Sequence, residues 1–589
     1  MNRCISRRNT LKCFSRKWIE IVFGTTFACM GFSFIGEAQA ETVSTTSTNS
    51  PQKMPSESLS LNPTRTLLQT LLEEMRSEKG QHSLNFLCEH GITPAVLMKL
   101  YTQGNFQPLW FTPDAQLTCA EEVINTLEHA DEEGLENNDY RLILDKIHQY
   151  LHPLDGTPSL ENLLMADILL SRVLLEYIND INGERLCPKK IDKELYLERP
   201  KIDLPEFLIS LIKESPYGDC SWIKKLSPES PQYQALKGML KNLKERKAQG
   251  KSDVVLSPGG VLKKGSSGKR VCELREVLAT RGYGTLQNQE CSIFDETLEH
   301  AVMDFQKDSG LEVDGNVGEE GQRVLSQRLD DKIDQVIVTM ERWRWLPRNL
   351  GLKYVFVNIP DFQVRTYENE NHVFTMPVII GRTYRETPVL AAEIINVIYN
   401  PTWTVPPLIA SQDKLKDVQK KGPQYFIDKK IHVYKDGREI DPRKVNWTHV
   451  TKENFNFHLR QDSGDQNALG RIRFTILSPF DVYLHGTPEQ ELFSKVKRTL
   501  SSGCVRLENP VKMAEFVFGG NSSWDGTTIK AAIDSGKTQT IPLQNPVKVY
   551  IQYMTVFLED NGKVRFLEDV YGQDKEVLNA LKKRNPQAP

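Results

Sequence analysis

Two short stretches in the C-terminal part of the chain carry its densest chemical pattern. They read Tyr483-Leu484-His485-Gly486-Thr487 and Ser501-Ser502-Gly503-Cys504-Val505-Arg506. Residues 481–484 alternate in polarity, which predicts a strand that delivers His485 at its end. Gly503 gives the backbone the freedom to bring Cys504 close to that histidine. The two stretches therefore predict a β-type unit in which one histidine and one cysteine meet.

A cysteine that meets a histidine is typical of a thiol nucleophile. The thiolate is the reactive form, and a free thiol with a pKa of ~8.5 is only slightly ionised near neutral pH. His485 within hydrogen-bond reach of Cys504 would take this proton and later return it to a leaving amine. Backbone amides beside Gly503 would face the developing oxyanion. The alternative is an inert buried thiol with an unrelated histidine, and the glycine-rich context favours the reactive pair.

The number of cysteines also favours a free thiol. The chain has ten, and seven of them follow residue 40. An odd number leaves at least one thiol unpaired within a monomer. Cys504 is the only cysteine after Cys291, so no neighbour in the sequence competes for it by forming a disulfide. We expect Cys504 to stay free, whereas the other six can be paired or simply buried.

Length and composition predict several folded units. The chain has 589 residues, of which 39% are hydrophobic and 26% are charged, so it is too long for one core and too apolar for a disordered chain. Its 74 Lys and Arg against 77 Asp and Glu give a net charge of -3. This balance argues against a broad nucleic-acid or membrane-binding surface.

The first forty residues predict an export signal. A basic start at 3–17 precedes an apolar run at 21–35, and residues 38–40 have the small side chains of a cleavage site. The run is shorter than the ~20 residues that span a bilayer as a helix, so a cleaved signal is favoured over an uncleaved anchor. Residues 6–12 resemble a twin-arginine signal, but Thr10 stands where an aromatic residue is usual, so the export route stays open. Either way, we expect the body of the protein outside the cytoplasm.

A tether and a helical region follow the signal. Residues 41–63 are rich in Ser, Thr, Asn, Pro and Gln and predict a flexible tether. Stretches 67–75 and 163–178 repeat apolar residues at helical spacing, which predicts an α-helical scaffold domain over 64–251. Residues 257–260, Ser-Pro-Gly-Gly, break this pattern and mark its end.

Two smaller helical segments come next. Residues 260–328 predict a three-helix module with a turn at Asp314-Gly315. A linker helix follows within 329–352. Its end carries Trp343 and Trp345, which we expect to pack between domains, with carbohydrate stacking as the alternative.

From residue 353 the pattern changes to strands. Short β-type runs bounded by Gly, Pro and Asn are residues 354–359, 378–380 and 394–398. Residues 547–558 and 564–567 predict a terminal hairpin around a tight turn. Residues 407–455 are polar and Lys-rich, which predicts a capping insertion that covers a site. The expected fold class is a multidomain α+β chain whose mainly β domain occupies residues 353–575.

At the histidine and cysteine stretches the sequence resembles an L,D-transpeptidase of the YkuD type. The family pattern is a histidine, a short gap, then Ser/Thr-His-Gly-Cys followed by Asn or Arg. His485 and Cys504 are nineteen residues apart, which fits this pattern. Ser502 stands where many members have a second histidine, and Arg506 where many have Asn, so no role of a second imidazole is carried over. This variant resembles the large periplasmic members that also carry a peptidoglycan-binding domain.

Further matches extend the resemblance through most of residues 85–520. The predicted three-helix module resembles the small peptidoglycan-binding domain, at residues 262–265, 294–295, 301–306 and 310–318. The other matching stretches are 108–110, 133–140, 341–345, 400–407, 460–461 and 467–470.

The resemblance implies a role for each residue of the two stretches. Cys504 would attack the carbonyl of the L-centre of diaminopimelate in a donor tetrapeptide stem and release D-Ala. His485 would act as base and then as acid, oriented by the Gly486 carbonyl. The amides of Gly503 and Cys504 would form the oxyanion hole. The residues that would line the donor site are Tyr483, Ser502 and Arg506, of which Arg506 would bind a stem carboxylate.

The implied partner is peptidoglycan, and the implied role is in cell-wall organisation and cell shape. The side-chain amine of another stem would take the acyl group and form a 3→3 cross-link, or an outer-membrane lipoprotein would take it in some relatives. A carbapenem is expected to acylate Cys504. The resemblance implies no cofactor and no metal.

Three other functions compete with this one. An L,D-carboxypeptidase would use water as the acceptor, and a non-catalytic wall-binding scaffold would keep Cys504 only as a vestige. The full set of His485, Gly503, Cys504 and Arg506 argues against a vestigial site. A metal hydrolase would need ligands, and only His148 and His152 lie four residues apart, without an accompanying His-Glu-x-x-His motif. The spacing of His148 and His152 is better explained by their position near a helix C-terminus, where the helix dipole favours histidine.

Overall fold

The computed structural model describes residues 63–76, 92–111, 119–154, 156–193, 195–197, 201–214, 219–249, 254–284, 291–520 and 523–584. Residues 61–589 form one compact unit. The predicted export signal and the tether up to residue 62 lie outside the described residues. None of the helices within the described ranges is long and apolar enough to cross a membrane.

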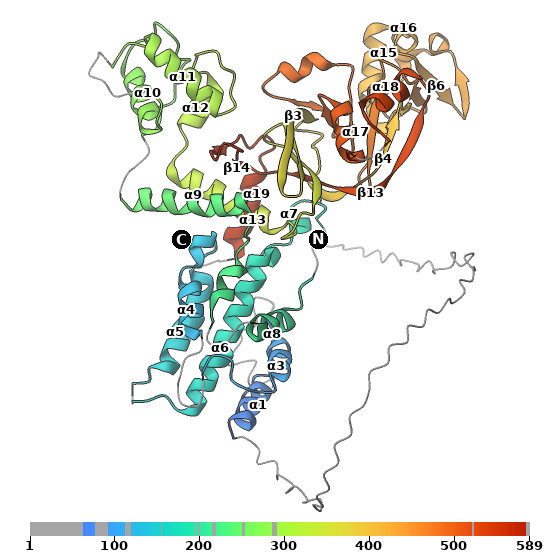
Figure 1. Ribbon diagram of the computed structural model, residues 1–589. Coiled ribbons are helices and arrows are strands. Elements are labelled where there is room, and N and C mark those ends of the chain that lie inside the picture. Colours follow the sequence, from blue (N-terminus) through green and yellow to red (C-terminus); the bar gives the residue numbers. More distant parts are fainter. Residues whose placement is uncertain are drawn as a thin grey trace, which may run out of the picture. The chain divides into compact units, whose positions relative to one another are not determined.

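The N-terminal helices pack around one long helix, α6 (Leu160–Asn179) (Figure 1). Its side chains are buried almost without interruption from Leu163 to Ile178, because helices contact it on every side. Those neighbours are α1 (Pro63–Arg76), α3 (Pro94–Gln103), α4 (Ala120–Glu128), α5 (Asn138–Leu151) and α8 (Leu204–Glu214). The apolar residues of this bundle form one core, as the helical spacing predicts.

A buried carboxylate anchors the segment that follows α3. Asp167 of α6 is fully buried and accepts the backbone amides of Leu109, Trp110 and Phe111, the nearest at 2.8 Å. The Tyr101 hydroxyl also donates to Asp167, at 2.6 Å. Burial raises the pKa of Asp167 to about 6, while these hydrogen bonds act to lower it.

Asp167→Asn is expected to flatten the dependence of stability on pH. The folded pKa of about 6 lies above the ordinary value of 3.8, so between these pH values the folded state binds more protons than the unfolded state. The free energy of unfolding of the wild type should therefore fall as the pH rises from ~4 to ~6. Urea denaturation at several pH values measures this slope. Equal slopes for wild type and variant would contradict the assignment.

The linker helix α13 (Leu329–Arg344) holds the two tryptophans in buried positions. Trp343 stacks on Phe356, with ring centroids 5.7 Å apart. Trp345 is 2% exposed, and its Nε1 donates to Glu341 at 2.9 Å. Trp343 thus packs against the β domain, and both indoles are too buried to stack on carbohydrate.

The predicted three-helix module consists of α10 (Lys269–Thr280), α11 (Glu296–Asp308) and α12 (Glu319–Leu325) around its own core. Asp295 caps α11 by accepting the Leu298 amide at 2.9 Å. The predicted Asp-Gly turn forms around the buried Gln306, whose Oε1 accepts the Gly315 amide and whose Nε2 donates to Asp314. Gly315 has φ +71°, a left-handed conformation that suits glycine.

The cysteines divide into pairs and free thiols. Cys119 pairs with Cys220 in the helical bundle, and Cys272 pairs with Cys291 in the three-helix module. Among the described residues the free cysteines are Cys187, which is exposed, and Cys504, which is partly exposed. Cys504 is thus unpaired, as the odd cysteine count favours.

The C-terminal domain is built on a sheet of nine strands, in the order β11-β3-β12-β10-β9-β4-β13-β1-β2. Strand β2 also pairs with β3, so the sheet curls back on itself. The strands are β1 (Lys353–Asn358), β2 (Gln363–Glu368), β3 (Asn371–Gly381), β4 (Leu390–Tyr399), β9 (Ile472–Ile476), β10 (Tyr483–His485), β11 (Thr499–Ser501), β12 (Val505–Leu507) and β13 (Gln539–Gln552). Helices α17 (Pro510–Phe518) and α18 (Gly526–Asp534) pack against it. The multidomain α+β fold class is confirmed.

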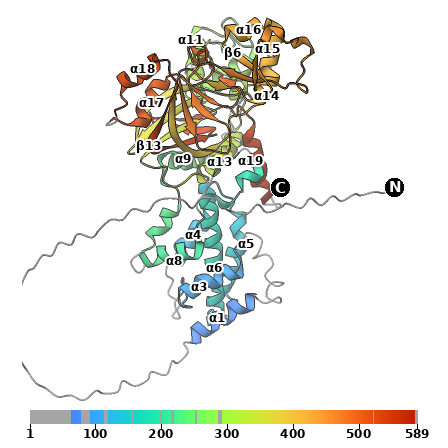
Figure 2. The ribbon, with the colours of Figure 1, turned by 90° about the vertical axis from the view of Figure 1, so that its right-hand side faces the viewer.

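The polar insertion forms a subdomain with a separate small core. Its sheet has the order β5-β8-β6-β7, and its apolar core runs from Val405 to Leu459. The elements are β5 (Trp403–Thr404), α14 (Pro407–Ile409), α15 (Leu415–Lys421), α16 (Gln424–Asp428), β6 (Ile431–Lys435), β7 (Arg438–Ile440) and β8 (His458–Gln461). Figure 2 shows α14, α15, α16 and β6 gathered at one end of the β domain.

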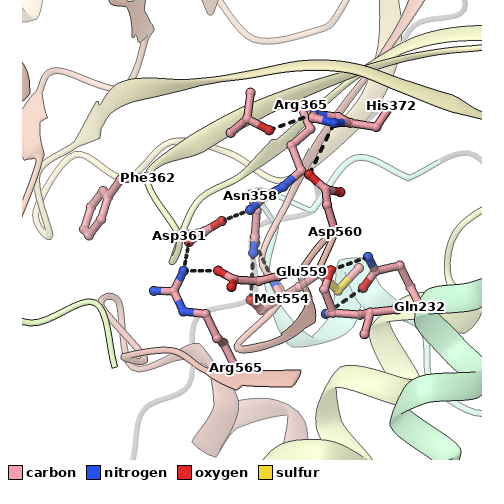
Figure 3. A network of polar contacts seen from close by, with 12 residues as sticks. Gln232, Asn358, Asp361, Phe362, Arg365, His372, Met554, Glu559, Asp560 and Arg565 are labelled. Atoms are coloured by element: carbon pink, nitrogen blue, oxygen red, sulfur yellow. Dashed lines mark hydrogen bonds and ion pairs between the residues drawn. The ribbon is translucent and has the colours of Figure 1, made fainter. Parts of the chain in front are cut away.

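The predicted terminal hairpin is shorter than expected. Residues 547–558 do not form one strand, because β13 pairs with β1 and β4 in the main sheet and ends at Gln552. The Asn358 side chain then binds the Met554 backbone in both directions, at 2.9 and 3.0 Å (Figure 3). Because the Asn358 side chain occupies both backbone groups of Met554, the strand ladder of β13 does not continue to this residue. The hairpin itself consists of β14 (Val556–Leu558) paired with β15 (Val564–Phe566).

An ion-pair network holds that hairpin to the sheet. Asp361 binds Arg365 at 2.6 Å and Arg565 at 3.4 Å, and Arg565 also binds Glu559 at 2.6 Å (Figure 3). The network joins β15 to the start of β2 through charged groups that are mostly buried.

Candidate active site

The two sequence stretches meet on neighbouring strands. Strands β10 and β12 pair in parallel with His485 opposite Arg506, and Cys504 directly precedes β12. Both His485 and Cys504 line one cavity of about 1500 Å³. The predicted site residues in that lining are Tyr483, His485, Ser502, Cys504 and Arg506, while Gly486 and Gly503 lie in the adjoining backbone.

The cavity lies between the β domain and the insertion. Insertion residues in its lining include Trp403, Val405, Lys414, Lys421, Tyr425 and Lys429. Of the described residues around the cavity, seven are Lys or Arg and four are Asp or Glu. This excess of positive charge favours an anionic ligand.

His485 is fixed as a neutral base. Its side chain is 4% exposed, and Nδ1 lies 2.5 Å from the Gly486 carbonyl oxygen. Because a carbonyl can only accept, Nδ1 carries the proton and Nε2 keeps its lone pair. Burial, together with Arg506 and Arg473, lowers the pKa of His485 to about 3. The imidazole is therefore uncharged at neutral pH.

Cys504 is held as a neutral thiol. Its Sγ lies 3.7 Å from the Asp481 carbonyl oxygen, where the S–H can donate weakly. Burial raises the pKa of Cys504, while the Tyr483 backbone, Arg506 and Arg473 oppose that rise. A thiol with a raised pKa needs a base to become a nucleophile, and His485 lines the same cavity.

The loop before β12 is tightly hydrogen-bonded. Gly503 has φ +113°, which a side chain would strain. The Ser501 hydroxyl donates to the Cys504 carbonyl at 2.6 Å and accepts the Gly503 amide at 3.2 Å. The Gly503 amide, assigned to the oxyanion hole by resemblance, is thus engaged with Ser501 in this structure.

The remaining predicted residues each contact a charged neighbour. Arg506 pairs with Glu489 at 2.5 Å. The Arg473 guanidinium lies over the Tyr483 ring, 4.3 Å from its centroid. These pairings place the Tyr483 and Arg506 side chains among the charged groups that line the cavity.

Ser502 contacts an arginine that the sequence did not single out. Arg385, on the β3–β4 loop, donates to the Ser502 hydroxyl at 3.2 Å. The same guanidinium binds Asp413 and Gln412 of the insertion, at 2.5 and 2.7 Å. Arg385 therefore connects the capping insertion to the cysteine loop. The sequence holds no motif around Arg385 that indicates these contacts, because Asp413 and Ser502 lie 28 and 117 residues away along the chain.

The pH dependence of Cys504 alkylation follows from these two pKa shifts. A thiol with a raised pKa should react with iodoacetamide at a rate that climbs until the pH passes the ordinary thiol range. A histidine with a pKa of about 3 adds no step between pH 5 and 8. A plateau at neutral pH, typical of a thiolate–imidazolium pair, would contradict this picture. Mass spectrometry of the Cys504 peptide measures the rate.

The described residues offer no competing metal centre. Among them, no group of three or more His, Cys, Asp or Glu side chains could hold a metal ion. His148 instead faces Glu128, at 3.5 Å, near the end of α5.

Comparison with protein families assigns the segment that holds this cavity. Residues 352–530 match the model described as the L,D-transpeptidase catalytic domain, YkuD. This segment is therefore similar to the YkuD catalytic domain. Residues 95–240 match a "Scaffold domain", and residues 267–325 match a "Putative peptidoglycan binding domain". The resemblance drawn from the sequence is confirmed for both the YkuD domain and the peptidoglycan-binding domain.

Individual proteins show the same relationship. A "Putative L,D-transpeptidase" of Haemophilus influenzae is 32% identical over 224 residues, which are 38% of this chain and 45% of that protein. The chain thus spans about half the length of this curated relative.

Solved L,D-transpeptidase structures are also similar. One from Xylanimonas cellulosilytica is 15% identical, covers 50% of this chain and 99% of its own, and gives a TM-score of 0.17. One from Stackebrandtia nassauensis is 13% identical, covers 51% of this chain and 96% of its own, and gives a TM-score of 0.19.

Proposed function

We propose that this protein is a cysteine-dependent L,D-transpeptidase that forms 3→3 cross-links in peptidoglycan. The observation that carries the proposal is the free Cys504 thiol and the neutral His485 imidazole in one cationic cavity of a YkuD domain. The thiol supplies the nucleophile and the imidazole supplies the base.

The first half-reaction transfers the donor stem to the enzyme. His485 Nε2 takes the Cys504 proton as Sγ attacks the carbonyl carbon at the L-centre of diaminopimelate. The Cys504 backbone amide would stabilise the resulting oxyanion, since the Gly503 amide is bound to Ser501. The intermediate then collapses, the bond to D-Ala breaks, and the imidazolium proton passes to the leaving amine. A thioester on Cys504 and free D-Ala are the products.

The second half-reaction transfers the acyl group to a second stem. The side-chain amine of diaminopimelate attacks the thioester carbonyl and gives its proton to Nε2. The C–S bond breaks, and the thiolate takes that proton back. The Gly486 carbonyl keeps Nε2 as the working nitrogen throughout, because it holds the other proton on Nδ1.

The charge of the cavity supports a peptidoglycan stem as the substrate. A stem peptide carries several carboxylates, and the cationic lining offers them favourable positions. The matched peptidoglycan-binding domain would raise the local concentration of stems near the cavity. The same nucleophile would be acylated by a carbapenem.

We also propose that the protein is exported to the periplasm. The signal pattern in residues 1–40 supports this location. The two disulfides in the helical bundle and the three-helix module are typical of an oxidising compartment.

The experiment is a product analysis. Residues 41–589 are incubated with tetrapeptide muropeptides, beside His485→Gln, and the products are identified by mass spectrometry. Dimers together with released D-Ala are expected from the wild type, and the loss of the base should slow them by ~10²- to 10⁴-fold. Tripeptide monomers without dimers would identify a carboxypeptidase instead. A wild type that yields neither product would leave only the wall-binding scaffold.

A further inference from the structure

The β3–β4 loop lies against the cysteine loop at more than one point. Strand β11 pairs in parallel with β3, with Ser501 opposite Gly381. The Arg382 amide donates to the Ser501 carbonyl at 3.1 Å. A Cβ at Gly381 would lie 2.1 Å from the Arg385 carbonyl oxygen, so the loop folds back on itself more closely than any side chain would permit. These contacts hold the residues before Cys504 in a position that depends on the conformation of the β3–β4 loop.

Thr387 makes the decisive contact. Its side chain is fully buried, and its hydroxyl donates to the Gly503 carbonyl at 2.8 Å. The same oxygen accepts the Gly381 amide, also at 2.8 Å. The hydroxyl hydrogen is thus committed to Gly503, and Thr387 cannot turn away without leaving a buried polar group unpaired.

A fixed Gly503 carbonyl also fixes the Cys504 amide. The carbonyl of Gly503 and the N–H of Cys504 belong to one planar, trans peptide group, so they point in opposite directions. A hydroxyl that holds the carbonyl on one side therefore aims the amide at the other side. Because the Gly503 amide is bound to Ser501, the Cys504 amide is the donor of this loop whose direction Thr387 sets.

The C-terminal segment holds Thr387 in turn. The Tyr571 hydroxyl donates to the Gly381 carbonyl at 2.7 Å and accepts the Thr387 amide at 3.3 Å. The Tyr571 ring stacks on Tyr553, with centroids 5.7 Å apart, and its amide donates to the Tyr553 hydroxyl. Gln573, at the start of α19 (Gln573–Arg584), donates to the Glu386 carboxylate at 2.8 Å. Tyr553, Tyr571 and Gln573 lie beyond residue 530, where the match to the YkuD model ends.

We propose that Thr387 and Tyr571 are positioning residues that aim the Cys504 amide at the oxyanion. Thr387 acts through the Gly503 carbonyl, and Tyr571 acts by holding Thr387. The proposal rests on the proposed function, in which Cys504 attacks a carbonyl. It adds that the chain beyond the YkuD match takes part in building the oxyanion hole.

The test compares two reactions of the same thiol. Acylation by the carbapenem meropenem develops an oxyanion, whereas alkylation by iodoacetamide is a displacement at carbon that develops none. Thr387→Val removes the hydroxyl at constant shape and should slow acylation by about 100-fold, the effect of losing one oxyanion donor. Alkylation should keep its wild-type rate and pH profile. A residue with only a structural role would slow both reactions together.

Two further variants make the test independent of folding defects. Thr387→Ser restores the hydroxyl and should return acylation to near the wild-type rate. Tyr571→Phe keeps the stacked ring and should slow acylation by about tenfold, the value of one hydrogen bond. The matched control is Tyr550→Phe, which deletes a hydroxyl bonded to the Leu350 carbonyl at 3.0 Å, away from the cysteine loop, and should change neither reaction.

The outcomes separate this proposal from the proposed function. A wild type that is alkylated but never acylated would contradict both. A wild type that is acylated, with Thr387→Val and Tyr571→Phe equally fast, would overturn only the positioning role. Equal losses in acylation and alkylation for these two variants would also overturn it. Selective loss of acylation in Thr387→Val, with recovery in Thr387→Ser, is the result expected.

Discussion

Cys504→Ala is expected to abolish both cross-linking and the release of D-Ala. Among the described residues that line the cavity, Cys504 is the only cysteine and His485 is the only histidine. The Gly486 carbonyl orients that histidine as the base. Loss of the nucleophile from such a pair typically costs about 10⁴-fold or more in rate. Product formation is followed by mass spectrometry of muropeptides, and thermal unfolding checks that the variant folds.

The chain provides a matched control for that substitution. Cys187 is also a free cysteine, but it is exposed and lies outside the cavity lining. Cys187→Ala should keep full activity. Activity that survives in Cys504→Ala, or that disappears in Cys187→Ala, would contradict the assignment of the nucleophile.

Arg344→Met is expected to destabilise the protein by about 3–5 kcal/mol, because it leaves the buried Glu341 carboxylate without its cationic partner. Arg344 and Glu341 are both fully buried and bind each other at 2.6 Å. Arg344 also donates to the Glu133 carbonyl and to the Tyr233 hydroxyl, at 2.8 and 3.0 Å. The side chain thus joins α13 to α9 (Pro231–Ala248) and to the helical bundle. Urea denaturation of the wild type and the variant measures the loss.

An exposed ion pair serves as the control for this stability effect. Arg443 binds Asp441 at 2.8 Å, but its side chain is 63% exposed. Arg443→Met should leave the free energy of unfolding unchanged, since solvent screens the pair. If Arg344→Met lowered the free energy of unfolding as little as Arg443→Met does, the stabilising role of the buried Arg344–Glu341 pair would be contradicted.

Local patterns in the sequence predict the fold class and the chemical centre. Helices such as α6 can be predicted because their apolar residues recur at helical spacing. His485 and Cys504 stand in a compact motif, and the odd cysteine count favours a free thiol at Cys504. These features depend on residues that are close in the sequence, so a reading of the sequence alone can find them.

Contacts between distant segments explain what the sequence could not predict. The hairpin prediction was too long because Asn358, about two hundred residues earlier, ends strand β13 by binding Met554. Thr387 and Tyr571 belong to no motif, and their importance arises only when three separate segments meet. Arg385 likewise belongs to no sequence motif. The fold brings it between Asp413 of the insertion and Ser502.

The most direct test of the account is the intact mass of the enzyme during turnover. The wild type is mixed with a tetrapeptide donor stem in the absence of an acceptor and is quenched with acid. We predict an added mass equal to the stem without its terminal D-Ala, located on the peptide that contains Cys504 and absent from Cys504→Ala. A wild type that releases D-Ala without this adduct, or an adduct that persists in Cys504→Ala, would contradict the thioester mechanism.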